Sequence, residues 1–157
     1  MTYKIIFLDF DGVLIPASAK GFNMRNIDNL NELIRKTGAK IVVTSDWKRK
    51  HDVTKILYDN GVKGEILGIT PNFSIKEDET IKVPKGLEIK EWLNKFNSFD
   101  GENELKYVTN YVILDDHHID MLVEQIDNMV EIDQTKGFDG KALKDAISIL
   151  IRDEIII

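Results

Sequence analysis

The chain has 157 residues, of which 43% are hydrophobic and 31% charged, and its net charge at pH 7 is −6. These values predict one globular domain over residues 1–157, and they exclude a global basic field that would recruit nucleic acid. The chain has no cysteine, which excludes disulfides, thiolate metal sites and a cysteine nucleophile and fits a cytoplasmic protein. We expect no secretion signal and no membrane span, because no apolar stretch approaches the roughly 20 residues of a membrane helix.

Apolar runs and helical periodicities alternate along the chain. Continuous apolar runs are typical of strands that are buried on both faces, whereas apolar residues at spacings of three and four predict helices. In chain order we expect strand 3–9, helix 27–34, strand 41–43, helix 52–60, strand 65–69, polar loop 70–83, helix 84–96, loop 97–106, strand 107–114, helix 119–126, strand 129–132 and helix 140–152. This alternation predicts an α/β fold, a three-layer α/β/α sandwich around a Rossmann-like parallel sheet. We expect the apolar tail 155–157 to be packed or to lie at an oligomer contact.

Acidic residues follow the first predicted strand. Asp9 and Asp11 come directly after an apolar run, and Gly12 next to them allows a sharp turn. An isolated Asp-x-Asp-Gly is most often a surface turn. At the carboxyl end of a buried strand, however, the two carboxylates face the crevice where open α/β sheets bind ligands.

Two further strands end in polar residues of a matching kind. The second strand is followed by Thr44, Ser45 and Asp46, and the strand 107–114 by the pair Asp115-Asp116. Parallel strands bring their carboxyl ends to one edge, so these groups converge with the first acidic pair. Several carboxylates in one crevice raise each other's pKa unless a cation is present. The pattern therefore predicts a divalent cation, which Mg²⁺ suits, and an anionic substrate.

The combined pattern resembles the haloacid dehalogenase (HAD) superfamily of aspartate-nucleophile phosphatases. Its first motif, Asp-x-Asp-x-(Thr or Val)-hydrophobe after the first strand, matches residues 9–14 at every position. Ser45 matches the second motif, Lys85 at a helix start the third, and the pair Asp115-Asp116 the fourth. The resemblance spans residues 3–140. It implies the fold expected above.

The resemblance also implies a mechanism. Asp9 attacks phosphorus and forms an aspartyl-phosphate, while Asp11 protonates the leaving oxygen and then deprotonates the hydrolytic water. Ser45 and Lys85 bind the transferring phosphoryl oxygens. Mg²⁺ is held by Asp9, the backbone carbonyl of Asp11 and one acid of the Asp115-Asp116 pair. The lysine assignment stays open, because two other lysines of the same region could reach the site: Lys76 and Lys82.

The substrate is less well defined than the reaction. The stretches 44–48 and 85–89 are similar to small HAD domains associated with RNA repair proteins. Many phosphatases of the superfamily carry a cap domain, for which neither the segment 12–44 nor the segment 46–84 leaves room. We therefore expect an open site for a phosphorylated substrate, such as a nucleic-acid end, a nucleotide, a sugar phosphate or a phosphoprotein. The oligomeric state is left open.

Several residues near the second strand have competing interpretations. The basic run 48–51 could bind a phosphodiester backbone, but we favour the solvated first turn of a helix. Trp47 could stack on a base, but a tryptophan at such a turn is more often packed into the core. Ser45 can cap the following helix as well as bind phosphate. We expect His117 and His118 to be exposed loop residues.

Two other classes of protein compete with a phosphatase. The first is a phosphate-sensing module with the same fold, against which the presence of both Asp9 and Asp11 argues. The second is a phosphoacceptor receiver domain, whose phosphorylated aspartate follows the third strand. Here the third strand is followed by Thr70 and no acid, so we set the receiver interpretation aside.

Overall fold

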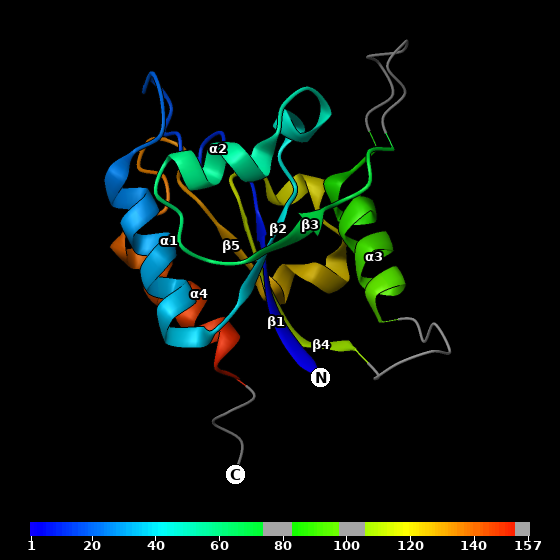
Figure 1. Ribbon diagram of the computed structural model, residues 1–157. Helices are drawn as coiled ribbons and strands as arrows, with labels where there is room; N and C mark the ends of the chain where they lie inside the picture. Colours follow the sequence, from blue (N-terminus) through cyan, green and yellow to red (C-terminus); the bar gives the residue numbers. More distant parts are fainter. Residues whose placement is uncertain (74–82, 98–105, 153–157) are drawn as a thin grey trace.

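Five parallel strands form the centre of the structure, in the order β3-β2-β1-β4-β5 across the sheet (Figure 1). The computed structural model describes residues 1–73, 83–97 and 106–152. The strands are β1 (Thr2–Leu8), β2 (Lys40–Val43), β3 (Ile66–Ile69), β4 (Tyr107–Asp115) and β5 (Met129–Glu131). Because β1 pairs with β2 on one side and with β4 on the other, the direction of winding reverses at β1. Such a switch point is where open α/β sheets bind ligands.

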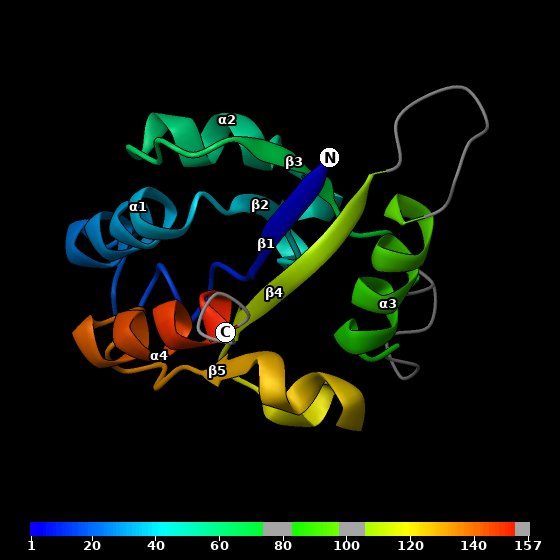
Figure 2. The ribbon, with the colours of Figure 1, turned by 90° about the horizontal axis from the view of Figure 1, so that it is seen from below.

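Helices cover both faces of the sheet (Figure 2). The α-helices are α1 (Met24–Thr37), α2 (Val53–Asp59), α3 (Lys85–Phe96) and α4 (Gly140–Leu150), and short 3₁₀ helices are η1 (Asp46–Arg49), η2 (His118–Asp120) and η3 (Val123–Asn128). Helices α1, α2 and α4 pack against one face, and α3 packs against the other together with the segment that contains η2. The expected three-layer α/β fold is thereby confirmed.

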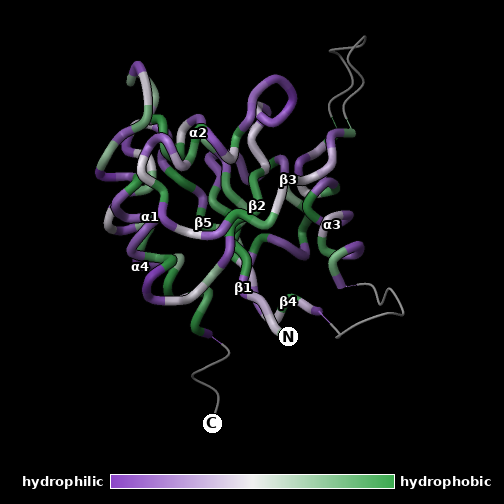
Figure 3. The backbone as a smooth tube through the Cα atoms, viewed as in Figure 1, coloured by the Kyte–Doolittle hydropathy of each residue, from purple (hydrophilic) through white to green (hydrophobic). Residues whose placement is uncertain are grey.

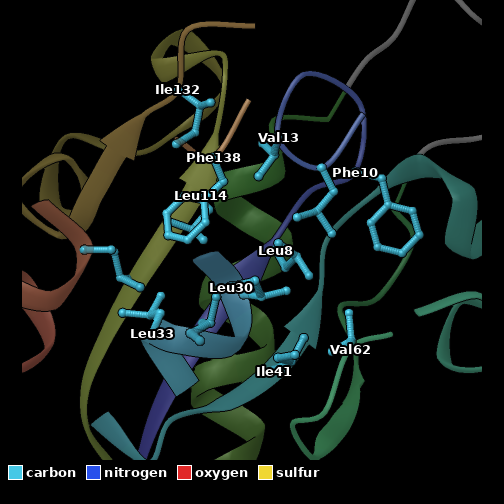
Figure 4. Close-up of a cluster of buried hydrophobic side chains, with 14 of the residues drawn as sticks. Leu8, Phe10, Val13, Leu30, Leu33, Ile41, Val62, Leu114, Ile132 and Phe138 are labelled. Atoms are coloured by element: carbon cyan, nitrogen blue, oxygen red, sulfur yellow. The ribbon is translucent and has the colours of Figure 1, made fainter. Parts of the chain in front are cut away.

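The strands are apolar on both faces because helices lie on each side of them. Along β1, Ile6 and Leu8 belong to the larger core cluster, whereas Ile5 and Phe7 point into the cluster beneath α3. Figure 4 shows the larger cluster, in which residues of α1 meet the strands. In Figure 3 the hydrophobic colour is concentrated on the central strands and the hydrophilic colour on the outer segments. The continuous apolar runs of the sequence are thus explained by burial on two sides.

The α-helix expected at 119–126 is absent, and two 3₁₀ helices take its place. Met121 and Leu122 between them are extended. Ile119 and Val123 are 82% and 93% exposed, so the apolar periodicity of this segment does not face the core. Gln125 holds the turn instead, because its Oε1 accepts from the Leu122 N–H at 3.0 Å and its Nε2 donates to the Gly86 carbonyl at 2.8 Å.

The remaining expected elements have counterparts among the described residues, with ends that shift by a few positions. Most of the loops expected at 70–83 and 97–106, and the tail 155–157, lie outside the described residues. Among the described residues, no folded cap domain separates the sequence motifs. None of the helices described is both long and apolar enough to span a bilayer.

Candidate active site

The candidate residues lie in a row along the carboxyl edge of the sheet. The backbone ladder continues past the strands, since Asp9 donates its N–H to the Leu114 carbonyl at 3.2 Å and Thr44 donates to the Leu8 carbonyl at 2.9 Å. Asp9 therefore stands between the ends of β4 and β2. The convergence expected from parallel strands is what the geometry shows.

Lys85 joins two carboxylates at the centre of this row. Its Nζ lies 3.1 Å from Asp9 Oδ2 and 3.0 Å from Asp115 Oδ2. The other oxygen of Asp9 accepts from the Phe10 N–H at 2.8 Å, and the other oxygen of Asp115 accepts from the His117 N–H at 2.9 Å. Both acids are buried, so their orientations are fixed by charge-assisted hydrogen bonds.

Burial and charge act in opposite directions on these groups. Burial raises the pKa of Asp9 to about 7, although the positive charge of Lys85 partly offsets this effect. Burial also raises the pKa of Asp115. For Lys85, burial lowers the pKa, but the negative charges of Asp9 and Asp115 outweigh it and raise the pKa above the ordinary lysine value. The single positive charge of Lys85 does not balance the two buried carboxylates, and a divalent cation would supply the missing charge.

Lys85 comes into place because α3 begins there. Pro84 precedes the helix and has the extended backbone of a helix entry, which suits a residue with no N–H to satisfy. Gly86 then allows close packing, since a Cβ at this position would lie 2.5 Å from Gln125 Oε1 and 2.8 Å from the Leu122 nitrogen. The two competing lysines, Lys76 and Lys82, lie outside the described residues.

Asp11 lies at the exposed rim of the site and is held by Trp47. The indole Nε1 of Trp47 donates to Asp11 Oδ2 at 3.1 Å. The ring itself packs edge-on against Phe10 and Phe22, at centroid distances of 5.6 and 6.0 Å. The prediction that Trp47 packs into the core is therefore borne out by these contacts. Its hydrogen bond to Asp11, across 36 positions of sequence, is a site contact that sequence reasoning missed.

Asp116 lies against the turn that follows Asp9. A Cβ at Gly12 would be 2.6 Å from Asp116 Oδ2, and Gly12 has a φ of +81°, so both space and backbone require glycine there. His117 Nδ1 lies 2.9 Å from Asp116 Oδ1. Ligand atoms of Asp115, Asp116 and His117 all lie within 4.8 Å of one another. This group is close enough to hold a cation.

Two hydroxyl groups follow β2, and their surroundings differ. Ser45 caps η1, because its Oγ accepts from the Trp47 N–H at 3.2 Å. The hydroxyl of Thr44 is buried and has no hydrogen-bond partner among the described residues. Buried hydroxyls are nearly always paired, and Thr44 stands next to Asp9 across the ladder. The phosphate-binding role of Ser45 stays a prediction, and Thr44 is a second candidate for it that the sequence did not single out.

The basic run 48–51 is not uniformly solvated, contrary to expectation. The side chain of Lys48 is 1% exposed and that of Glu88 is 4% exposed, and their Nζ and Oε1 atoms lie 2.9 Å apart. Lys48 also donates to Thr70 Oγ1 at 2.8 Å and to the Pro71 carbonyl at 3.3 Å. The other oxygen of Glu88 accepts from the Phe73 N–H at 2.9 Å. This buried ion pair joins η1, α3 and the segment after β3.

His117 and His118 are exposed, as expected, but neither is an isolated loop residue. His118 is paired with Glu131. The Asp116 carboxylate accepts a hydrogen bond from His117 and raises the pKa of that imidazole. His117 therefore belongs to the acidic environment of the site, whereas His118 contacts the end of β5.

The parallel sheet and the carboxylate–lysine cluster at its carboxyl edge define a HAD-type domain. A family model described as the HAD domain in Swiss Army Knife RNA repair proteins matches residues 5–143, and the chain belongs to this family. No curated protein and no solved structure matches the chain. The family supports a phosphatase-like hydrolase role in RNA repair.

Proposed function

We propose that the protein is a magnesium-dependent phosphomonoester hydrolase that uses Asp9 as its nucleophile. The observation that carries this proposal is the arrangement of Asp9, Lys85 and Asp115, with Lys85 Nζ 3.1 and 3.0 Å from the two carboxylates. A buried carboxylate that is oriented by a lysine and by a backbone N–H is poised as a nucleophile rather than as a surface charge. The family membership points to the same reaction class.

Each side chain has a distinct part in the proposed reaction. The Asp9 carboxylate attacks phosphorus, which forms the aspartyl-phosphate and releases the leaving oxygen. Asp11 gives that oxygen a proton and then takes one from the water that hydrolyses the intermediate. Trp47 orients Asp11 through its indole N–H. Lys85 and the hydroxyl groups of Thr44 and Ser45 neutralise or bind the phosphoryl oxygens.

The donor set fits a hard divalent cation. Asp9 and Asp115 share the ammonium of Lys85, and Asp116 is the acid of the pair that lies against the Asp9–Gly12 turn. We therefore assign the metal to Asp9, the backbone carbonyl of Asp11 and Asp116, with Asp115 beside them. All of these offer oxygen, the donor that Mg²⁺ prefers. When bound, the ion neutralises the carboxylates and the phosphate and so lowers the electrostatic cost of the attack.

The proposed substrate is the terminal phosphate of an RNA. The family description names RNA repair proteins, and no folded cap domain encloses the site among the described residues. An uncapped site admits the end of a polymer. We further propose that residues 1–157 form a single cytoplasmic hydrolase domain.

Phosphate release from a substrate panel tests this function. The panel contains an aryl phosphate, nucleotides, sugar phosphates, a phosphopeptide and RNA with a 3′- or a 5′-phosphate, each with Mg²⁺ and with EDTA. We expect release that requires both Mg²⁺ and Asp9, so that Asp9→Asn is inactive while it remains folded. Folded wild-type protein that releases no phosphate from any substrate would indicate a phosphate-sensing module instead.

A further inference from the structure

A cavity of about 480 Å³ lies between η1, the end of β3 and α3. Among the residues that the structure describes, the lining contains cations and apolar or aromatic groups and no carboxylate, although the chain as a whole is acidic. The residues that matter here are Lys48, Arg49, Ile69, Pro71, Trp92 and Lys95. A lining of this kind favours an anionic ligand that also has a flat apolar part.

The cavity continues the row of the active site. Thr70, which lines it, donates its N–H to the Val43 carbonyl at 3.0 Å, as Thr44 donates to the Leu8 carbonyl at 2.9 Å. Thr70 is therefore two strands away from Asp9, or about 10 Å at the usual spacing between strands. This separation is within the reach of the nucleoside that carries a phosphate bound at Asp9.

The buried ion pair described above builds the wall of the cavity. Lys48 binds Thr70, Pro71 and Glu88, so η1, the end of β3 and α3 are fixed relative to one another. The charge of Lys48 is neutralised by Glu88, so Lys48 has a structural role rather than a ligand-binding one. Of the described lining residues, Arg49 and Lys95 are therefore the cations that can contact a ligand.

Each of these two cations forms a surface ion pair that can be exchanged at little cost. Arg49 lies 3.6 Å from Asp46, and Lys95 lies 3.5 Å from Glu91. Exposed ion pairs at such distances contribute little to stability. A phosphate diester can replace the carboxylate partners and form charge-assisted hydrogen bonds in their place.

Trp92 contributes a hydrogen-bond donor rather than a stacking face. Its ring is stacked on Phe96 with centroids 4.8 Å apart and is edge-on to Phe7 at 5.6 Å. A Cβ at Gly68 would lie 4.0 Å from its Nε1, so the glycine leaves that side of the indole clear of a side chain. The N–H has no hydrogen-bond partner among the described residues, and an acceptor on a base or a ribose would satisfy it.

We propose that this cavity holds the nucleoside next to the scissile phosphate of an RNA strand, with a flanking phosphate on Arg49 and Lys95. The inference rests on the proposed phosphatase function of Asp9 and narrows its substrate to polynucleotide ends. Trp92 donates to the nucleoside, and Ile69 and Pro71 provide the apolar surface for the base. The protein thereby discriminates RNA ends, which occupy both the cavity and the site at Asp9, from small phosphomonoesters, which occupy only the site at Asp9.

Selectivity between two substrates tests the proposal. We compare kcat/KM for a short single-stranded RNA with a terminal phosphate and for an aryl phosphate, in Arg49→Ala and Lys95→Ala. Matched controls are Arg35→Ala, which removes an arginine paired with Glu32, and Lys90→Ala, which removes another lysine of α3. We expect each cavity variant to lower the ratio of kcat/KM for RNA to kcat/KM for aryl phosphate about five- to tenfold. The slope of the logarithm of RNA affinity against the logarithm of salt concentration should become shallower by about one. The control variants should leave both quantities unchanged.

The outcomes separate this inference from the function on which it rests. Suppose that the protein hydrolyses aryl phosphate and that this hydrolysis depends on Asp9. The cavity assignment alone would then be overturned if RNA is no better a substrate than aryl phosphate, or if the cavity variants and the control variants lose the same activity. No release from either substrate by folded wild-type protein would overturn the proposed function and this inference together. A ratio that falls only in the cavity variants supports both.

Discussion

Replacing Glu88 by glutamine should destabilise the fold strongly, because it leaves the Lys48 ammonium buried without a counter-charge. The glutamine has nearly the same shape and still offers an oxygen to Lys48. Breaking a buried ion pair by removing one charge costs about 3–5 kcal/mol. For a domain of this size this corresponds to a fall in Tm of about 6–20 °C. Thermal and urea unfolding followed by circular dichroism measure both quantities.

Glu65→Gln is the matched control for this experiment. Glu65 lies 3.0 Å from Lys40, nearly the separation of the buried pair, but the two side chains are 58% and 36% exposed. The same chemical change there should cost less than about 1 kcal/mol. Equal losses of unfolding free energy in the two variants would refute the reasoning, since burial is the main difference between the pairs.

The pH dependence of the Glu88 variant gives a second test. Burial lowers the pKa of Lys48, and the negative charge of Glu88 works against that effect. Without Glu88 the pKa of Lys48 in the folded state falls further. At a pH between this value and the ordinary lysine value of about 10.4, Lys48 is protonated in the unfolded chain but not in the folded one. Unfolding free energy then rises with pH. The difference between variant and wild type should therefore shrink as the pH is raised from 7 towards 10.

Three shorter predictions concern the site itself. Trp47→Phe keeps the aromatic packing but removes the N–H that holds Asp11, so kcat should fall about tenfold for substrates with poor leaving groups and much less for an aryl phosphate. In EDTA, the raised pKa of Asp9 means that the folded state holds a proton that the unfolded state has lost. Unfolding free energy should therefore fall by up to about 4 kcal/mol from pH 4 to pH 7, and Asp9→Asn should flatten this slope in urea titrations. Gly12→Ala forces a side chain into a φ of +81° and against Asp116, so calorimetry should show a loss of about 1–3 kcal/mol.

The sequence predicts the sheet and its acidic edge because the signals are local. A strand that is buried on both faces must be apolar throughout, and β1 is recognisable for that reason. Acids directly after such a run reach the carboxyl edge whatever the rest of the chain does. Lys85 is also marked locally, since it follows a proline that suits a helix start. Its contact with both Asp9 and Asp115 depends on where the helix begins and on the close packing at Gly86.

The features that the sequence did not predict depend on distant partners. Lys48 looks solvated within a basic run, but its neighbours come from residues 70, 71 and 88. The apolar pattern at 119–126 suggests an α-helix, whereas Gln125 bonds to Gly86 and stabilises a tighter turn. Trp47 finds Asp11 across 36 positions. No local periodicity encodes such contacts.

Lys85 gives the acidic edge an internal counter-ion before any external ion arrives. Zinc fingers need their metal to fold because metal binding supplies the free energy that folds them. Here one ammonium group lies between two buried carboxylates, at 3.1 and 3.0 Å. The chain can therefore fold with the site preformed, and under the proposed function the uptake of Mg²⁺ would be a separate, reversible step. Chelation should silence the protein without unfolding it, and activity should return when the ion is restored.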